Sequence, residues 1–330
     1  MKAFKLPKGT EITGSDCLLT DTGKVTGRVT FEQAAEYFKG RFFGGGGVDP
    51  SLLNYLSNPN LLINWDFRNP VNQKGLREYD ANSYCIDGWK ANNLKIIPGT
   101  VRLTGTGAYS HYFSQILPPE TVSELKGETV TLSLLEENDT GYNPVLAVQI
   151  VEGGKSTYLG ADNYNKGLHF GTVTIPDTDI EKIIFYCNAS GTGTDDIIGA
   201  KLEQGPYQTL AHQDAAGNWV MNDPQPDKSL ELLKCQRYQM VYKNADCIGF
   251  STENIIYIYK PCMRADPVVV QNEAVLALAS GEIAVNALTI INSKQSGAFV
   301  VATSKTVNFG TGPVYVKHDS PAYLILDANL

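Results

Sequence analysis

The chain of 330 residues is long enough for two or three domains, each with its own core. Hydrophobic residues make up 42% of it, and its 31 glycines and 17 tyrosines are typical of many short strands joined by turns. The formal net charge is -8 and no Lys/Arg-rich run occurs, which argues against nucleic acid as a partner. No apolar run approaches the roughly 20 residues that cross a bilayer, so we expect no membrane insertion.

The cysteine and histidine pattern indicates neither a metal centre nor catalysis. Without a C-x-x-C pair, the six scattered cysteines are expected to be free thiols, buried under reducing conditions. The four histidines lack metal-ligand spacing, and no Gly-x-Ser-x-Gly or His-Glu-x-x-His motif occurs. The cysteines are Cys17, Cys85, Cys187, Cys235, Cys247 and Cys262; the histidines, expected to be structural or surface residues, are His111, His169, His212 and His318.

Residues 1–47 predict a small N-terminal segment that ends in a linker. Thr30 is a candidate N-cap with Gln33 three positions later, and residues 31–38 then predict a short amphipathic helix. A helix this short needs a partner for its apolar stripe. The four-glycine run at 44–47 lacks the lysine of a phosphate-binding loop and predicts a hinge or linker.

Residues 48–205 predict one β-sandwich. Turn signals such as Pro98-Gly99 separate short apolar runs at the spacing of a two-sheet sandwich, and apolar residues alternate through 130–134. A first strand, a structured loop and a second strand are expected within 60–89. The further strands are predicted at 95–103, 108–117, 128–135, 145–151, 168–175, 182–188 and 197–203.

Residues 206–237 predict a polar linker with a short helix capped by Asp227 or Ser229, running through Leu230, Leu233 and Cys235. Residues 238–330 predict a second, smaller β-sandwich, so the fold class is mainly β. Its strands are expected at 239–242, 255–260, 267–271, 284–292, 298–302 and 315–327.

The segment 60–89 carries the pattern N-L-L-x-N-x-x-F-x-x-P-V-N-Q-x-G, followed by Tyr and I-D-x-W. This pattern resembles the jelly-roll, galactose-binding-like modules of tail fibre proteins in phages and prophages of Gram-positive gut bacteria. Its opening N-L-L-x-N-x-x-F also resembles carbohydrate-binding modules appended to secreted glycanases. The K-L-E-x-G sequence at 201–205 resembles the strand that closes such modules. The resemblance implies a central jelly roll.

Other segments resemble the same tail proteins. Residues 18–38 are similar to their N-terminal attachment segments, in which a strand pair precedes a helix and which trimerise or dock on the tail. A small cap packed on the next domain is the alternative. The L-x-x-C-Q-R-Y sequence at 232–238 and the proline-flanked stretch 261–267 resemble elements of their last domain.

Glycan binding needs aromatic rings that stack on the C–H faces of a pyranose, and polar groups that hydrogen bond its hydroxyls. The stretch 158–165 is the most loop-like and the least explained by packing, so we consider it first. Trp65 and Trp89 are expected in the core, and Asn72 and Gln73 are expected to satisfy backbone groups of their loop. The candidate glycan-binding residues are Tyr158, Asp162, Asn163, Tyr164 and Asn165, together with Tyr109, His111, Tyr112 and Tyr142.

Carboxylates that could cleave a glycoside bond occur at Glu136-Glu137, Asp139 and Asp195-Asp196. They stand beside Asn, Thr and Gly, so we interpret them as solvated turns, and no rung-like repeat of a tailspike β-helix is visible. We therefore expect no enzyme. Asp66 or Asp87 could hold a structural calcium ion, as in some modules of this fold, or could cap a loop. No other cofactor is expected.

The resemblance implies a non-enzymatic tail fibre or receptor-binding protein of a phage virion, with host cell-surface glycan as its ligand. It implies a homotrimer with contacts at 31–38 and 229–238, and tail or baseplate partners at the N-terminal segment. Residues 1–19 lack a secretory signal pattern, so we expect synthesis in the host cytoplasm and release by lysis. The alternatives are a bacterial carbohydrate-binding accessory protein, a structural fibre or collar protein that binds no sugar, and a tailspike hydrolase.

Overall fold

The computed structural model divides the chain into two compact units, residues Met1–Ser57 and Asn58–Leu330. It describes residues 17–21, 24–29, 57–79, 83–105, 107–137, 145–161, 163–165, 167–191, 193–243, 246–259, 263, 268–271, 275–284, 289–290, 298–302, 308–317 and 324–328. Among the helices within these ranges, none is long and apolar enough to cross a membrane.

The first unit contains an antiparallel hairpin. Strands β1 (Cys17–Asp21) and β2 (Lys24–Val29) pair from Cys17 opposite Val29 to Asp21 opposite Lys24. A strand pair therefore stands where the sequence similarity implied one. The predicted helix at 31–38 and the glycine run at 44–47 lie outside the described residues.

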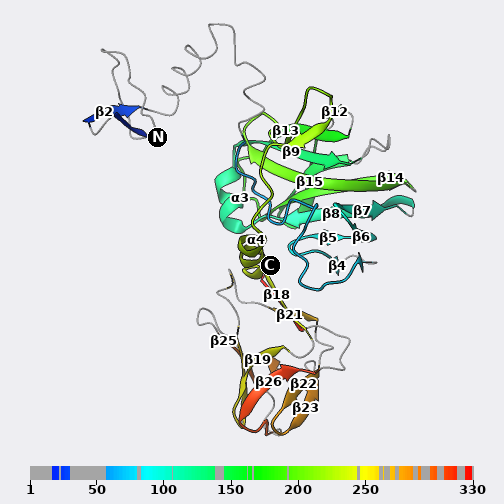
Figure 1. The fold of residues 1–330 in the computed structure, drawn as a ribbon, viewed down its shortest axis with the longest axis vertical. Helices are drawn as coiled ribbons and strands as arrows, with labels where there is room; N and C mark the ends of the chain where they lie inside the picture. The colour runs from blue at the N-terminus through cyan, green and yellow to red at the C-terminus, as the bar shows by residue number, and fades with distance from the viewer. Residues whose placement is uncertain are drawn as a thin grey trace. The chain divides into compact units, whose positions relative to one another are not determined.

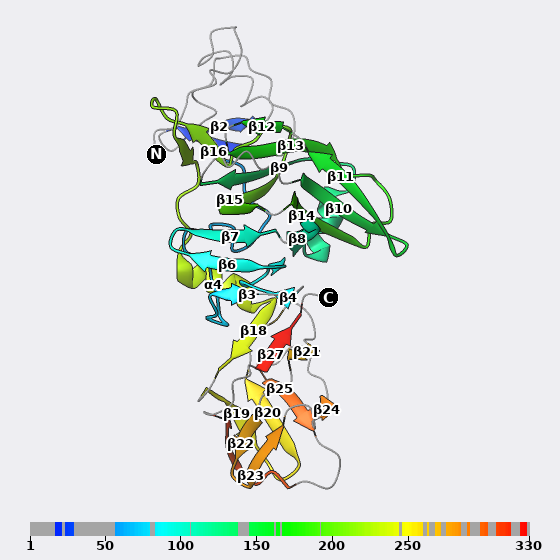
Figure 2. The same cartoon turned by 90° about the vertical axis from the view of Figure 1, so that its right-hand side faces the viewer.

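A jelly-roll β-sandwich occupies the first part of the second unit. One sheet has the order β11-β10-β14-β8-β5-β4 and the other β12-β13-β9-β15-β7-β6-β3, and the latter runs from top to bottom in Figure 2. The six strands of the first sheet, in chain order, are β4 (Ser83–Tyr84), β5 (Lys90–Ala91), β8 (Gly107–Ile116), β10 (Val145–Glu152), β11 (Lys155–Ala161) and β14 (Lys182–Gly191). The seven of the second are β3 (Glu78–Tyr79), β6 (Leu94–Ile97), β7 (Thr100–Thr104), β9 (Thr129–Glu136), β12 (Asn163–Asn165), β13 (Leu168–Thr174) and β15 (Thr194–Gln204).

Aromatic rings fill the centre of this sandwich. The indole of Trp89 stacks on Phe113 with ring centroids 4.2 Å apart, and Phe67 and Phe185 meet it edge-on at 5.2 and 5.8 Å. The indole Nε1 of Trp89 donates hydrogen bonds to the carbonyls of Ile63 and Asn64, at 3.1 and 3.0 Å. Trp65 and Trp89 are buried, which confirms their predicted place in the core.

The expected first strand within 60–89 is wrong. Residues 61–67 follow β15 irregularly, with Leu61 and Phe67 donating backbone bonds to Leu202 and Ile198 and a single isolated bridge from Asp66 to Gly199. Asn64 has a φ of 50°, which lies outside the β region and prevents a continuous ladder.

Local chemistry also changes three other predicted elements. Gly99, at φ 89°, folds the expected strand 95–103 into the hairpin of β6 and β7. Between the strands predicted at 108–117 and 128–135, Pro119 stands in the first turn of helix α3 (Pro119–Leu125), where a missing N–H costs nothing. Of the stretch 158–165, expected as a loop, residues 158–161 lie in β11, which pairs with β10 along seven residue pairs, and residues 163–165 lie in β12.

Helix α4 (Lys228–Gln236) joins the jelly roll to the last domain (Figure 1). Asp227 caps it as predicted, accepting hydrogen bonds from the backbone of Ser229 and Leu230. Of the apolar side chains that the prediction named on this helix, Cys235 is buried, whereas Leu230 and Leu233 are 62% and 57% exposed. The short hairpin of β16 (Ala211–Gln213) and β17 (Trp219–Met221) precedes the helix.

The last domain is a second β-sandwich with a core of its own, centred on Ile256, Phe309 and Leu326. The sequence analysis predicted no strand at 247–251 or at 275–278, where the structure has one each. The single strands predicted at 315–327 and at 284–292 each correspond to parts of two strands, at 312–316 and 324–327 and at 281–284 and 289–290. A three-stranded sheet has the order β18-β27-β21 and a seven-stranded sheet the order β23-β22-β26-β19-β20-β25-β24. Their bounds are β18 (Gln239–Tyr242), β19 (Cys247–Ser251), β20 (Ile255–Tyr259), β21 (Val268–Gln271), β22 (Val275–Leu278), β23 (Gly281–Ala284), β24 (Thr289–Ile290), β25 (Ala298–Ala302), β26 (Gly312–Val316) and β27 (Leu324–Asp327).

The cysteines follow the prediction except at one position. Cys85, Cys187 and Cys235 are free and buried, as expected for small hydrophobic side chains, whereas Cys247 is free and exposed. Burial raises the pKa of the Cys85 thiol to about 12. The side chains of Cys17 and Cys262 lie outside the described residues, and the predicted domain boundaries stay a prediction.

Replacing Trp89 with alanine should lower the free energy of unfolding by about 3–5 kcal/mol, because it removes the stacked indole and leaves a cavity. Chemical denaturation measures this change. Tyr207→Ala is the matched control: Tyr207 is 66% exposed, so its loss should change stability by no more than about 0.5 kcal/mol. A Trp89→Ala chain as stable as the control would contradict the role of the stack.

Candidate functional site

The outward face of the six-stranded sheet carries a set of tyrosines and polar side chains. Alternation along each strand turns them away from the core, since their sequence neighbours Phe113, Phe185 and Cys187 are buried. We call this surface the tyrosine face and define it by Tyr84, Lys90, Tyr112, Gln149, Tyr158, Tyr186 and Asn188.

Strand register places these residues in neighbouring rows. One row crosses the sheet through Ala147, Tyr186, Ser114, Lys90 and Tyr84. Asn188 pairs with Tyr112 in the row on one side, and Gln149 pairs with Tyr158 in the row on the other. The five strands that contribute residues to the central row are therefore all held by ladder hydrogen bonds.

Tyr186 lies at the centre of this surface. Its ring is 6.0 Å from that of Tyr112 at an interplanar angle of 16°, and 5.3 Å from that of Tyr158 at 60°. Burial, together with smaller contributions from the nearby Tyr158 and Tyr112, raises the pKa of Tyr186 to about 12. The hydroxyl therefore stays protonated at neutral pH and can both donate and accept a hydrogen bond.

Polar groups surround the rings. The ammonium of Lys90 lies 4.5 Å from the centroid of the Tyr84 ring, a cation–π geometry, and Gln149 donates from Nε2 to the Ser156 hydroxyl at 3.0 Å. Among the described residues, the buried side-chain oxygen of Asn188 has no hydrogen-bond partner. It is an available acceptor beside the ring of Tyr112.

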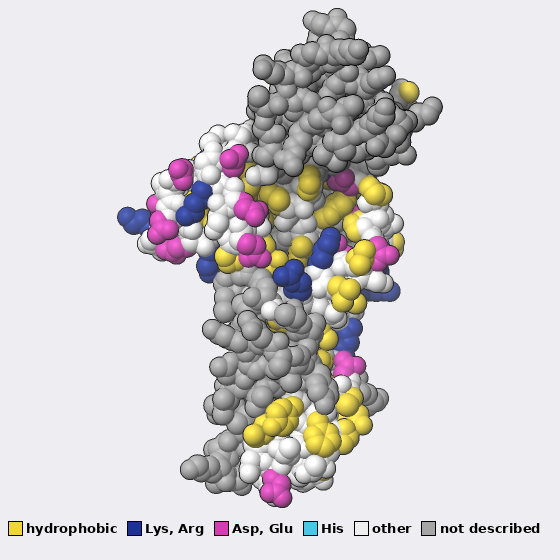
Figure 3. Space-filling model, turned by 90° about the vertical axis from the view of Figure 1, so that its left-hand side faces the viewer, with side chains coloured by type: hydrophobic (Ala, Val, Ile, Leu, Met, Phe, Trp, Pro, Cys, Tyr) yellow, Lys and Arg dark blue, Asp and Glu magenta, His cyan; other side chains and the backbone are white. Residues whose placement is uncertain are grey.

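The exposed fraction of the side chains varies along this face. Tyr158 is 52% exposed, whereas Tyr112, Tyr186 and Asn188 are half-buried, so the rings are held in place but remain reachable. Figure 3, seen from the side opposite to Figure 2, shows hydrophobic side chains, a colour class that includes tyrosine, gathered in a central hollow, with charged side chains on the arm beside it. Stacking on rings and hydrogen bonding to hydroxyls are both possible on such a surface.

The structure brings together two of the predicted glycan-binding residues. Tyr112 and Tyr158 meet through Tyr186, although they lie far apart in the sequence. Asn165 is exposed on β12, which belongs to the other sheet and pairs with β13. The remaining candidates have side chains outside the described ones; they are Tyr109, His111, Tyr142, Asp162, Asn163 and Tyr164.

Sequence reasoning missed Tyr84, Lys90, Tyr186 and Asn188. Each lies in a strand, and the search favoured loops. The alternation Lys182, Ile184, Tyr186, Asn188 opposite the apolar Ile183, Phe185, Cys187 was a usable signal, because it marks a strand with one aromatic on its outward side. Nothing in the sequence says that Tyr112 and Tyr158 flank that position.

The interpretation of the carboxylates as solvated turns is wrong for Glu136, Asp195 and Asp196, which lie in strands. Glu136 and Asp195 are buried at the ends of β9 and β15, and His169 Nε2 lies 3.1 Å from a Glu136 oxygen. Asp196 accepts two hydrogen bonds from Arg102, each at 2.6 Å. Glu137 is exposed, and Asp139 lies outside the described residues. Glu136, Asp195 and Asp196 therefore lie at the ends of strands and not at loop tips.

The two candidate calcium ligands are engaged in loop hydrogen bonds. Asp66 accepts from the backbone and guanidinium of Arg68, with the shortest contact 2.6 Å, and Asp87 accepts from the backbone and side chain of Gln73 at 2.7 and 2.5 Å. In the described part of the chain, no three His, Cys, Asp or Glu side chains are arranged to hold a metal ion. These residues fit the loop-capping alternative better than a calcium site.

The side chains of Asn72 and Gln73 form hydrogen bonds both within their loop and to residues outside it. Asn72 bonds Leu76 and Gly75, as predicted, and also accepts from the Tyr79 hydroxyl at 2.6 Å. Gln73 reaches the last domain, donating from Nε2 to the carbonyl of Gln239 at 2.9 Å. Its side chain therefore connects Asp87 of the jelly roll to β18.

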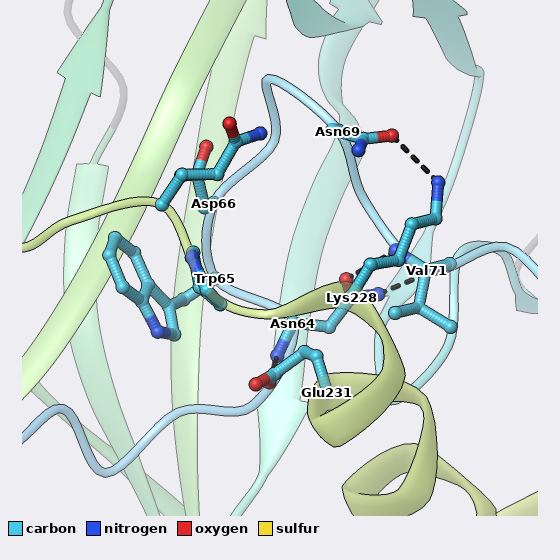
Figure 4. Close-up of a pocket in the computed structure, with 9 residues that line it drawn as sticks. Asn64, Trp65, Asp66, Asn69, Val71, Lys228 and Glu231 are labelled. Atoms are coloured by element: carbon cyan, nitrogen blue, oxygen red, sulfur yellow. Dashed lines mark hydrogen bonds between the residues drawn. The ribbon is translucent and has the colours of Figure 1, made fainter.

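A small pocket at the start of α4 belongs to the same connection (Figure 4). Asn64 donates its backbone N–H to Glu231 at 2.5 Å, and Lys228 donates to Asn69 at 2.7 Å. The enclosed space is about 10 Å³, which admits at most one water molecule. We therefore assign this pocket to the joint between domains and not to a ligand.

No protein-family model and no curated protein sequence matches the chain. Solved structures similar to it include the C-terminal family 22 carbohydrate-binding module of Clostridium thermocellum Xyn10B, at 16% identity and a TM-score of 0.31, covering 46% of this chain and 94% of that one. The tandem family 22 modules of Paenibacillus barcinonensis Xyn10C match at 9% identity and a TM-score of 0.30, covering 82% of this chain and 96% of that one. The single xylan-binding domain of the same protein matches at 12% and 0.30, covering 46% and 98%. The chain is thus similar to carbohydrate-binding modules in being built of β-sandwiches, and similarity at this level identifies no ligand.

Asp87 predicts a pH dependence of stability. Burial raises its pKa to about 6, so the folded chain favours the protonated carboxyl more than the unfolded chain does. The stability of the fold is therefore undiminished by Asp87 below about pH 4 and falls as the pH rises through 6, and the loss reaches about 3 kcal/mol at neutral pH. Chemical denaturation between pH 4 and 7 should show a loss of stability that Asp87→Asn abolishes. Parallel pH profiles of the two chains would contradict the assignment.

Proposed function

We propose that this protein binds carbohydrate without cleaving it, and that the tyrosine face is the binding surface. The observation that supports this most directly is the cluster of Tyr112, Tyr158 and Tyr186, in which the sheet holds the rings of Tyr112 and Tyr158 at 6.0 and 5.3 Å from the ring of Tyr186. The rings can stack on the C–H faces of pyranose rings, while Lys90, Gln149 and Asn188 offer groups for sugar hydroxyls.

The charge of this surface supports binding over cleavage. A glycoside hydrolase needs two carboxyl groups on either side of the scissile bond. The described residues that define the tyrosine face include a lysine, amides and phenols, but no carboxylate. Glu136 and Asp195, buried at strand ends, lack the exposure that a substrate requires.

Replacing Tyr186 with alanine should weaken glycan binding about tenfold or more, because it removes the central ring; tenfold corresponds to about 1.4 kcal/mol. The chain should first be screened on a glycan array and on insoluble polysaccharides, and the best ligand then titrated by calorimetry. Tyr186→Phe keeps the ring and should retain most of the affinity. Unchanged binding by the alanine variant, or no binding by the natural chain, would contradict the proposal.

In its narrower form, the proposal is a trimeric receptor-binding fibre of a phage virion that attaches to host cell-surface glycan. The sequence patterns that resemble tail fibres support it, as do Leu230 and Leu233, apolar side chains exposed on α4 beside the link between domains. Equivalent apolar side chains from three copies can meet at a three-fold axis and multiply weak sugar contacts. The alternatives are a bacterial carbohydrate-binding accessory protein, which fits the tyrosine face equally well, and a structural fibre protein that binds no sugar.

Light scattering tests the trimer. The full chain should have three times the mass of one chain, and the Leu230→Asp/Leu233→Asp variant should fall toward a single-chain mass because charged side chains resist burial. A chain lacking residues 1–47 shows whether the N-terminal segment contributes. A strict monomer at high concentration would rule out the fibre and leave the accessory protein.

A further inference from the structure

The last domain exposes a second set of aromatic side chains. Phe250 on β19 lies opposite Tyr257 on β20 and Pro313 on β26, and Tyr315 follows two residues after Pro313 on the same face. Phe250 and Tyr315 are 39% and 42% exposed. We call these four residues the aromatic patch. Apolar side chains also gather on the lower part of Figure 3, where this domain lies.

The patch is built by an irregularity of the sheet. The register of β19 against β26 shifts between Cys247 and Gly249, so that Cys247 and Phe250 both face outward while Ile248 is buried. A Cβ at Gly249 would lie 1.7 Å from the Tyr257 carbonyl oxygen, so the bulge requires glycine. The outward position of Phe250 therefore depends on a specific backbone arrangement.

Polar groups border the rings on one side. Tyr315 lies opposite Ala277 of β22, and Ala277 lies opposite Glu282 of β23. Lys317 donates from Nζ to Glu282 at 2.8 Å, close to the end of β26. Aromatic rings at the centre with hydrogen-bonding side chains at the edge are the combination that sugar binding needs.

We propose that the aromatic patch is a second carbohydrate-binding surface, separate from the tyrosine face, which stacks on the C–H face of a pyranose ring. The patch lies on β26, β19 and β20, inside the seven-stranded sheet, so their backbone groups are paired and cannot add a peptide strand. Because the backbone groups are paired, a ligand contacts the ring faces and the polar side chains at the edge of the patch.

The two exposed rings of the patch offer enough area for a sugar ring but, by themselves, much less than a protein interface buries. The exposed fractions of Phe250 and Tyr315 correspond to roughly 80 Å² each, taking about 200 Å² for an aromatic side chain. A stable protein interface buries about 800 Å² on each partner. A sugar ring needs far less area, and two separated surfaces would raise the affinity for a polymer through avidity.

The test compares four chains: the natural chain, Phe250→Ala/Tyr315→Ala, Tyr186→Ala, and the triple variant that combines these three substitutions. Their binding to insoluble xylan, cellulose, chitin and purified bacterial cell walls is measured. On the polysaccharide that the natural chain binds best, we expect each of the first two variants to bind at least about tenfold more weakly, and the triple variant to bind least. Tyr315→Phe keeps the ring and should bind like the natural chain. Tyr207→Ala is the matched control outside both surfaces, and thermal melts check that every variant folds.

The outcomes separate this inference from the proposed function. If Phe250→Ala/Tyr315→Ala binds every polysaccharide like the natural chain while Tyr186→Ala does not, the second surface is overturned and the proposed function stands. If only the patch variant loses binding, the patch is upheld and the tyrosine face falls. Light scattering completes the test: a dimer that the patch variant converts to a monomer would show a second copy as the occupant and overturn the inference.

Discussion

The stack of Trp89 on Phe113 is the interaction on which the jelly roll depends. It lies between the two sheets, and its indole N–H bonds the carbonyls of Ile63 and Asn64. The indole thereby pairs two carbonyls of the irregular segment 61–67, where the φ of Asn64 interrupts the ladder to β15. A single buried ring thus supplies apolar packing to the sheets and hydrogen bonding to a segment that lacks regular pairing.

The same segment connects the sandwich to the rest of the chain. Asn64 donates its backbone N–H to Glu231 of α4, and its side chain bonds Val71 and the carbonyl of Asp87. Gln73 continues the connection to Gln239 of β18. The buried polar groups of the joint are therefore linked to one another. The jelly roll and the last domain are connected by these specific hydrogen bonds.

The two surfaces proposed for carbohydrate differ in construction. The tyrosine face uses rings from three strands that support one another, and it raises the pKa of its central phenol by burial. The aromatic patch uses rings in two rows whose outward direction follows from a bulge at Gly249. The aromatic patch lies on interior strands of its sheet, whereas the tyrosine face spans its sheet from the edge strand β11 to the edge strand β4.

Local periodicity and turn chemistry were enough to predict the β-rich class, most strands of the first sandwich and the capped helix α4. They also predicted that Trp65 and Trp89 are buried. Only the tertiary structure decided that 158–161 is a strand, that Glu136 and Asp195 are buried, and that Leu230 and Leu233 are exposed. It alone brought Tyr112, Tyr158 and Tyr186 together, since they come from β8, β11 and β14 and their contact depends on strand order and register. Long-range pairing leaves no local pattern, so a surface assembled across strands is determined by the fold and not by any one stretch of sequence.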